Sequence, residues 1–265
     1  MSKVNKYIIG SDPEAFIVNE EGYIMSAIPL VPGDKSDPYV IGDGCSIQHD
    51  NILAEWCVPP TNDPQAFSDS MDHCVQWTES ILPQGYKVKF ISSFHVGSDQ
   101  LQDPQAKEFG CEPDYNAWQE GEANQKPDVN TNLRTAGGHI HIGYDHPTHV
   151  QNMEIIRVLD LFLAVPALYL DQDNLRRSMY GKAGSFRHKP YGVEYRSLSN
   201  FWVKDLALIT WVFNQIEVAM DFINCGGIIS EFDSLAIQLA VNTGDLAVAE
   251  AIITEYSMSI PEYAD

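Results

Sequence analysis

The sequence predicts an α+β fold built on an antiparallel β-sheet, because strand-like segments come first along the chain and helices gather late. The hydrophobic content of 44% and the aromatic content of 11% are those of a folded globular protein. No internal repeat, low-complexity tract or linker is visible in the 265 residues. We therefore expect one domain over residues 1–265, with a helical tail from about residue 203.

Six segments have the composition or the alternation of apolar and polar side chains that is typical of strands. In chain order they cover residues 7–18, 23–27, 51–58, 87–94, 137–144 and 191–198. Residues 11–14 interrupt the first segment, which predicts either a strand pair or one bent strand. Pro59 and Pro60 should end the third strand, because proline cannot donate a hydrogen bond to a sheet.

Five segments have helical patterns. They cover residues 64–82, 149–171, 203–224, 231–241 and 246–256. Suitable N-cap side chains precede three of them: Asn62 or Asp63, Thr148, and Thr243 or Asp245. Pro166 is expected to kink the second helix. Residues 97–136 have little apolar periodicity, and an irregular segment of that length in a compact domain is more often functional than idle.

The chain is strongly acidic, with a net charge of -21. Such a charge argues against a nucleic-acid backbone or an anionic membrane as the main partner, because like charges repel. It is compatible with carboxylates that surround divalent cations, although most of the 37 acidic residues must form a solvated surface. The five cysteines form no CxxC pair, and neither a signal peptide nor a membrane-spanning run is visible. We expect a soluble intracellular protein in a reducing compartment.

The histidine pair in residues 137–144 is the centre of the expected site. Successive side chains of a strand point to opposite faces, so His139 and His141 should share one face. Gly137 and Gly138 in front of them leave room for backbone or for a ligand. Taken alone, the pair fits a hydrogen-bonded, half-exposed sheet face as well as a ligand platform.

Three other strands carry acidic side chains. Asp12 and Glu14 flank a proline and can share a face, and Glu194 and Arg196 repeat the same spacing. Glu55 stands in an apolar strand, where a buried carboxylate needs a cation or hydrogen-bond donors. Each feature alone also fits an ion pair or a turn. Together, oxygen ligands with one imidazole suit Mg²⁺ or Mn²⁺ better than Zn²⁺, and neighbouring arginines suit phosphate.

Basic residues are concentrated just before the last strand. Five of the chain's 16 lie within residues 174–189: Arg176, Arg177, Lys182, Arg187 and Lys189. No GxxxxGK[ST], HExxH, GxSxG or strand-linked GxGxxG motif is present.

The motifs SDPEAF at residues 11–16, AGGHIHIG at 136–143 and YGVEYRSLSNFW at 191–202 resemble the carboxylate–amine ligase (amidoligase) family of tailed phages. Residues 109–118 also resemble a segment of that family. The family is related to glutamate–cysteine ligase and, more distantly, to glutamine synthetase. The resemblance implies a curved antiparallel sheet like the glutamine synthetase catalytic domain, holding ATP and divalent metals. It also implies that ATP phosphorylates a carboxylate and that an amine attacks the acyl phosphate.

Residue by residue, the resemblance implies a set of metal ligands: Asp12, Glu14, Glu55, His139 and Glu194. It likewise implies ATP contacts: His141, Arg196, Arg187 and Lys182. The first pair is Asp-Pro-Glu, where the wider superfamily usually has Glu-x-Glu. The partner of Glu55 on the neighbouring strand stays open between three candidates: Asp43, Gln48 and Asp50.

Catalysis is expected from Arg196 and Arg187 at the phosphates and from Asp114, which would take a proton from the incoming ammonium. Asn132 and Arg134 end the long irregular segment where substrate recognition is expected. The expected partners are small-molecule or peptide carboxylates and amines, in the host cytoplasm if the protein is phage-encoded; the oligomeric state stays open. The alternatives are a metal-dependent hydrolase on the same sheet and a non-catalytic acidic metal- or nucleotide-binding protein.

Overall fold

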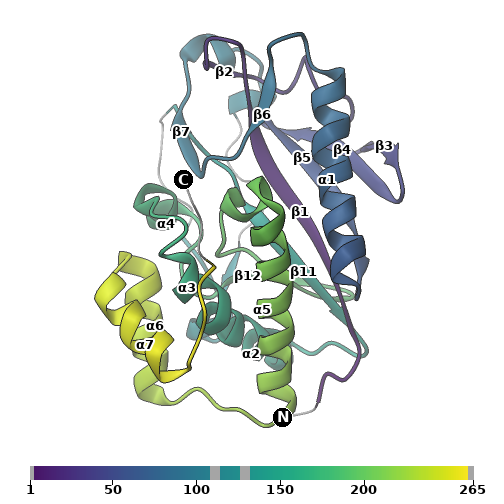
Figure 1. Cartoon of the computed structure of the whole chain (residues 1–265). Coiled ribbons are helices and arrows are strands. Elements are labelled where there is room, and N and C mark those ends of the chain that lie inside the picture. Colours follow the sequence, from purple (N-terminus) through teal and green to yellow (C-terminus); the bar gives the residue numbers. More distant parts are fainter. Residues whose placement is uncertain (1–2, 108–113, 126–131, 262–265) are drawn as a thin grey trace.

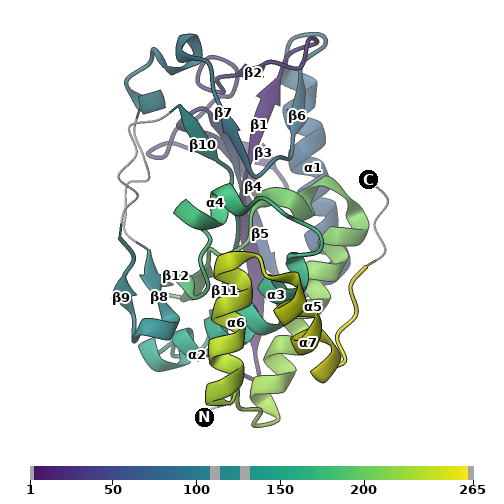
Figure 2. The same cartoon turned by 90° about the vertical axis from the view of Figure 1, so that its left-hand side faces the viewer.

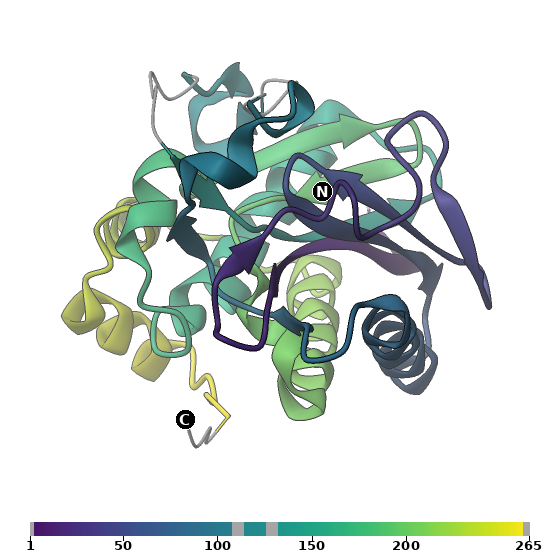
Figure 3. The ribbon, with the colours of Figure 1, turned by 90° about the horizontal axis from the view of Figure 1, so that it is seen from above.

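A large antiparallel sheet forms the centre of the computed structural model, which describes residues 3–107, 114–125 and 132–261 (Figure 1). Helices α1 (Pro64–Ile81) and α5 (Leu206–Asn224) lie side by side on one face of the curved sheet (Figure 3). From α5 to the last described residue the chain forms only helices and their connections. The predicted α+β class with an antiparallel sheet and a helical C-terminal part is confirmed.

The main sheet has 11 strands in the order β3-β4-β5-β1-β11-β13-β12-β8-β9, with β2 and β6 paired to β1. Their bounds are Tyr7–Val18 (β1), Ile24–Met25 (β2), Tyr39–Gly42 (β3), Cys45–Asp50 (β4), Leu53–Thr61 (β5), Lys87–Lys89 (β6), Tyr115–Asn116 (β8), Glu122–Ala123 (β9), Gly138–Tyr144 (β11), Ser185–Lys189 (β12) and Gly192–Tyr195 (β13). A separate pair consists of β7 (Ser93–His95) and β10 (Leu133–Thr135).

Strand β1 runs without a break through residues 11–14, so the single-strand alternative is right. Its residues Ser11 to Pro13 pair with β11, and the register against β5 shifts between Ile9 and Ser11. The prediction that two prolines end β5 is wrong, because the strand continues to Thr61. Strand β4 pairs with β5 only as far as Cys57, and on the other edge both prolines fall between the Val58 and Thr61 pairs with β1, where the register shifts.

The remaining helices are α2 (His149–Leu159), α3 (Val165–Ala167), α4 (Asn174–Met179), α6 (Glu231–Thr243) and α7 (Leu246–Glu255). Asp63, Thr148 and Asp245 cap α1, α2 and α7 as the sequence indicates. The long helix expected over 149–171 is interrupted by a π-helical turn at Asp160–Ala164. This turn lies ahead of Pro166, which lacks the N–H needed to continue the helix.

The apolar core lies between the sheet and the helices. Ile9, Ala15 and Ile17 of β1 point into it, so the alternation of the strand sends Asp12 and Glu14 to the other face. Helix α5 is long and apolar enough to cross a membrane by composition, but half of that segment is buried within the fold. A core helix of a folded domain has the same length and apolar composition, so α5 fits that role as well.

Candidate active site

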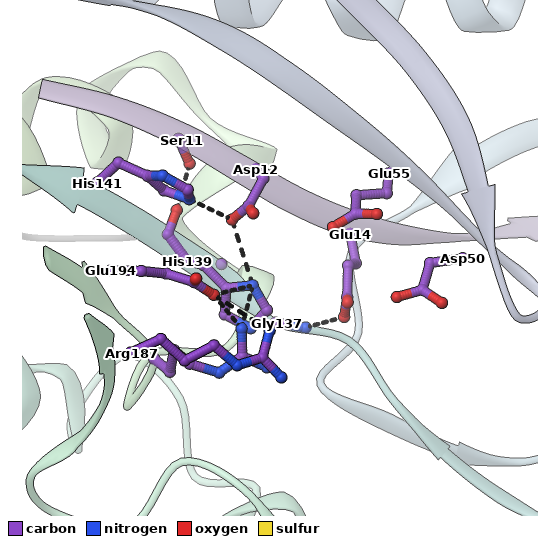
Figure 4. A network of polar contacts seen from close by, with 12 residues as sticks. Ser11, Asp12, Glu14, Asp50, Glu55, Gly137, His139, His141, Arg187 and Glu194 are labelled. Atoms are coloured by element: carbon purple, nitrogen blue, oxygen red, sulfur yellow. Dashed lines mark hydrogen bonds and ion pairs between the residues drawn. The ribbon is translucent and has the colours of Figure 1, made fainter. Parts of the chain in front are cut away.

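Six neighbouring strands bring polar side chains to the sheet face that the core helices leave uncovered (Figure 4). The pairing registers set Gln48 opposite Glu55, Glu55 opposite Glu14, Asp12 opposite His139, His141 opposite Glu194, and Glu194 opposite Arg187. The sheet thus brings the five expected metal ligands and both histidines onto one surface. The prediction that the histidines share a face is confirmed by their common contact with Asp12.

One group consists of Asp12, His139 and Glu194, with ligand atoms that all lie within 4.8 Å of one another. His139 Nδ1 lies 3.3 Å from Asp12 Oδ1 and 3.8 Å from Glu194 Oε1. Burial acts to raise the pKa of Asp12, but His141 and His139 outweigh it and hold that pKa well below its ordinary value. The Asp12 carboxylate is therefore ionised at neutral pH.

Cations surround Glu194, whose side chain is only 1% exposed. Lys189 Nζ lies 2.7 Å from Glu194 Oε2, Arg187 Nη1 lies 3.8 Å from Oε1, and Arg196 donates a hydrogen bond to Oε1. Burial acts to raise the pKa of Glu194, but Arg196 leads the opposing charges and lowers it to about 2. This end of the site is therefore rich in positive charge.

His141 contacts Asp12 and Tyr191. Its Nε2 lies 3.0 Å from Asp12 Oδ1, and its Nδ1 is hydrogen-bonded to the Tyr191 hydroxyl. Burial acts to lower the pKa of His141, but Asp12 outweighs it, and the result lies above the ordinary value. The ring is thus held against Asp12 and is not part of the cavity wall.

A second group consists of Glu14, Asp50 and Glu55, again with ligand atoms within 4.8 Å of one another. Glu14 Oε2 accepts a hydrogen bond of 2.6 Å from the Gly137 N–H, and Gln48 donates one to Glu55. Asp50 forms an ion pair of 2.7 Å with Lys35. Gln48 and Asp50 are thus both neighbours of Glu55.

In this second group Lys35 offsets the charge of Asp50, but burial dominates at Glu55 and at Glu14. Burial and then Asp12, Glu14 and Asp50 raise the pKa of Glu55 well above its ordinary value. Burial also raises the pKa of Glu14. Asp43, the third candidate partner of Glu55, lies in the turn between β3 and β4 and does not line the cavity. A cation at this group would offset the part of these pKa increases that comes from repulsion between the carboxylates, which is smaller than the part that comes from burial.

A cavity of about 650 Å³ is lined by all three residues of the second group and by Asp12 and His139 of the first, whereas Glu194 is buried behind the wall. From the expected site its wall includes Asp12, Glu14, Glu55, His139, Arg187, Arg196 and Asp114. Lys182 is exposed and outside the wall, and Asn132 does not line it either. Residues 108–113, which carry part of the fourth family-like segment, lie outside the described residues.

Two arginines in the wall are tied to the backbone. Arg134 donates hydrogen bonds to the Ala106 carbonyl at 2.6 Å and to Asn51 Oδ1 at 3.0 Å, so it fixes the irregular segment. Arg176 donates to the Ser197 carbonyl at 3.0 Å and to the Arg196 carbonyl at 3.3 Å. Burial lowers the pKa of Arg176 to about 10. Nothing in the sequence distinguished Arg176 from the other basic residues of 174–189 as the one that binds backbone carbonyls.

The two glycines before the histidines are crowded by the protein itself. A Cβ on Gly138 would collide with the Ser199 carbonyl and the Trp202 indole, and one on Gly137 would meet the His139 ring. Gly138 therefore makes room for backbone, which is the first of the two alternatives that the sequence left open.

Known proteins resemble parts of this chain. A family model described as Phage phiEco32-like COOH.NH2 ligase-type 2 matches residues 130–227, a range that contains His139, Arg187, Glu194 and Arg196. No curated protein matches the chain. The crystal structure of a bifunctional glutathione synthetase from Pasteurella multocida is similar at 13% sequence identity and a TM-score of 0.46. That similarity covers 96% of this chain and 47% of the other, so this chain spans about half its length.

The family match supports an enzyme that joins a carboxylate to an amine by a carbon–nitrogen bond. The match over residues 130–227 includes the motifs at 136–143 and 191–202. It therefore supports the resemblance of these two motifs to the phage carboxylate–amine ligases.

Proposed function

We propose that the protein is an ATP- and Mg²⁺-dependent carboxylate–amine ligase, with Mn²⁺ as an alternative metal, that forms an amide or peptide bond through an acyl phosphate. The observation that carries this proposal is that one cavity is lined by Glu14, Asp50 and Glu55, by Asp12 and His139 of the other group, and by Arg187 and Arg196. ATP, when bound, would supply the phosphoryl group that converts one carboxylate oxygen, a poor leaving group, into phosphate, a good one that the attacking amine displaces from the acyl carbon.

The donor atoms of both groups fit hard divalent cations. Glu14, Asp50 and Glu55 offer only carboxylate oxygens, and Asp12, His139 and Glu194 add one imidazole. Oxygen-rich sets of this kind suit Mg²⁺ and Mn²⁺. In the second group the raised pKa of Glu55 also reflects uncompensated negative charge, which a bound cation would stabilise.

Arg187 and Arg196 are the proposed phosphate contacts. Both line the cavity, and Arg196 is bound to Glu194 by hydrogen bonds from a guanidinium that has five N–H donors. Remaining donors can form charge-assisted bonds to phosphate oxygens. His141 acts in this scheme by orienting Asp12, which its Nε2 contacts at 3.0 Å.

Asp114 is the proposed acceptor of the proton that the attacking ammonium loses. It lines the cavity together with Tyr180, and its charge acts on the Tyr180 hydroxyl. A carboxylate in the wall of a water-restricted site can accept a proton while it orients the amine.

ADP release tests the proposal. The full chain is incubated with ATP, MgCl₂ and a panel of amino acids and peptides, and released ADP is measured. We expect release that requires Mg²⁺, a carboxylate and an amine together, and that His139→Ala abolishes. A folded protein that releases no ADP across the panel contradicts the proposal, and turnover without ATP would instead indicate a metal-dependent hydrolase.

A further inference from the structure

Helix α6 is apolar on two opposite sides, and the described chain covers only one of them. Ile237, Ala240 and Val241 are buried against the fold, where α6 packs on α7 and α4. Figure 2 shows α6 and α7 together on the side of the molecule nearest the viewer, and Figure 1 shows this side apart from the sheet. A helix that is apolar all round is normally buried, so the second side of α6 calls for a partner.

The uncovered side forms a continuous stripe. Its residues are Ile228, just before the helix, and Phe232, Leu235 and Leu239 within it. All four side chains are between 50% and 78% exposed. Within the helix, the spacing of three and four residues puts Phe232, Leu235 and Leu239 in one row, which is the pattern that one helix presents to another, and Ile228 lies in the segment that leads into α6.

The charge around this stripe restricts what can cover it. Residues 205–265 contain no Lys, Arg or His. Glu231 precedes Phe232 at the start of the stripe, and Asp245, which caps α7, follows the end of α6. Two copies of the chain packed through their stripes would bring acids together with no base between them, and an anionic membrane would be repelled in the same way.

We propose that the α6 stripe, defined as Ile228, Phe232, Leu235 and Leu239, binds an amphipathic helix of a partner protein whose apolar row is flanked by Lys or Arg. The apolar rows pack together, as in helix-in-groove recognition, and the basic flanks meet the acids of α6 and α7. This inference does not depend on the proposed ligase activity.

The stripe also ends near the cavity. Asn242, three residues after Leu239, accepts a hydrogen bond of 2.9 Å from the Ala183 N–H through its Oδ1. Gly181, two residues before Ala183, is in the cavity wall. A helix bound along the stripe would therefore lie beside the segment that leads into β12 and Arg187.

A synthetic peptide tests the inference on the full chain. The probe is a fluorescein-labelled helix of leucine and lysine, with leucines at three- and four-residue spacing, and binding is read as fluorescence anisotropy. We expect saturable binding that Leu235→Glu and, separately, Phe232→Glu weaken by about tenfold or more. Val150→Glu, at a side chain that is 63% exposed on α2, is the matched control and should bind the probe as tightly as the unaltered protein.

Two further peptides separate apolar recognition from bulk charge: a scrambled sequence of the same composition, and a version with glutamate in place of lysine. Equal binding of either peptide overturns the inference, as does a Leu235→Glu protein that keeps its affinity with an unchanged thermal transition. Sedimentation that shows a dimer dissolved by Leu235→Glu would assign the stripe to a second copy. Binding of the unaltered protein to phosphatidylcholine vesicles, if Leu235→Glu abolishes it, would assign the stripe to a membrane. Either of these two results overturns the inference of a partner helix.

Discussion

Asp160 accepts a hydrogen bond of 2.8 Å from the Tyr195 hydroxyl, which ties the π-helical turn to strand β13 from the core side of the sheet. The same Asp160 oxygen accepts a bond of 3.1 Å from the Ser197 hydroxyl. Asp160 thus holds the residues on both sides of Arg196, while Arg176 holds the Arg196 and Ser197 carbonyls. The arginine proposed to contact phosphate is therefore fixed in place by two buried ionisable side chains.

The first prediction concerns the pH dependence of stability at Asp160. Burial raises its pKa to about 6 in the folded protein, from 3.8. Between those pH values the folded state binds more protons than the unfolded state, so stability falls as pH rises from about 4 to about 6. The loss at this site is of the order of 3 kcal/mol, since each pKa unit corresponds to about 1.4 kcal/mol.

Asp160→Asn should remove that loss. Urea unfolding of the variant and of the unaltered protein, measured at intervals from pH 4 to pH 7, gives their difference in free energy of unfolding. We expect the unaltered protein to lose stability relative to the variant as pH rises. A difference that is constant over this range would mean that Asp160 does not titrate there.

Glu55→Gln should stabilise the metal-free protein and weaken its response to Mg²⁺. Burial and three neighbouring carboxylates disfavour the Glu55 charge, so a neutral amide should raise the free energy of unfolding at pH 7 by about 1 kcal/mol or more. Melting temperatures are measured in EDTA and in MgCl₂, with Glu21→Gln in an exposed turn as control. A lower melting temperature of Glu55→Gln in EDTA would contradict the account.

Glu194→Gln should have the opposite effect. The substitution leaves Lys189 and Arg196, whose side chains are 28% and 16% exposed, beside a neutral group; since only Glu194 is fully buried, we expect a loss of about 3 kcal/mol, the lower end of the range for a broken buried ion pair. Glu120→Gln is the matched control, because Glu120 pairs with Arg157 at 3.3 Å but is 84% exposed. Its expected cost is below about 1 kcal/mol. Chemical denaturation compares the two, and equal losses would rule out the buried network around Glu194.

The sequence predicts which site residues share one face of a strand. It does not predict which residues of different strands and helices come together when the chain folds. His139 and His141 could be assigned to one face from the strand period alone. Asp50 could not be separated from Asp43 as a neighbour of Glu55, because the register of β4 against β5 depends on the turn between these two strands. The roles of Asp160 and Arg176 depend on burial, and neither side chain stands in a motif.

The last prediction is that Gly138→Ala destabilises the protein at the centre of the site. A Cβ there would collide with the Ser199 carbonyl, which belongs to the rigid backbone at the start of the 3₁₀ turn Asn200–Lys204. Overpacking of this kind costs about 1–3 kcal/mol. Gly143→Ala on the same strand is the control, because its Cβ would lie 3.2 Å from the Ile8 side chain, which can move, and 3.6 Å from the Tyr191 carbonyl oxygen, an ordinary contact. Thermal unfolding should show a large loss for Gly138→Ala and a small one for Gly143→Ala. The reverse order would mean that the backbone around Ser199 does not pack against β11 as the structure has it.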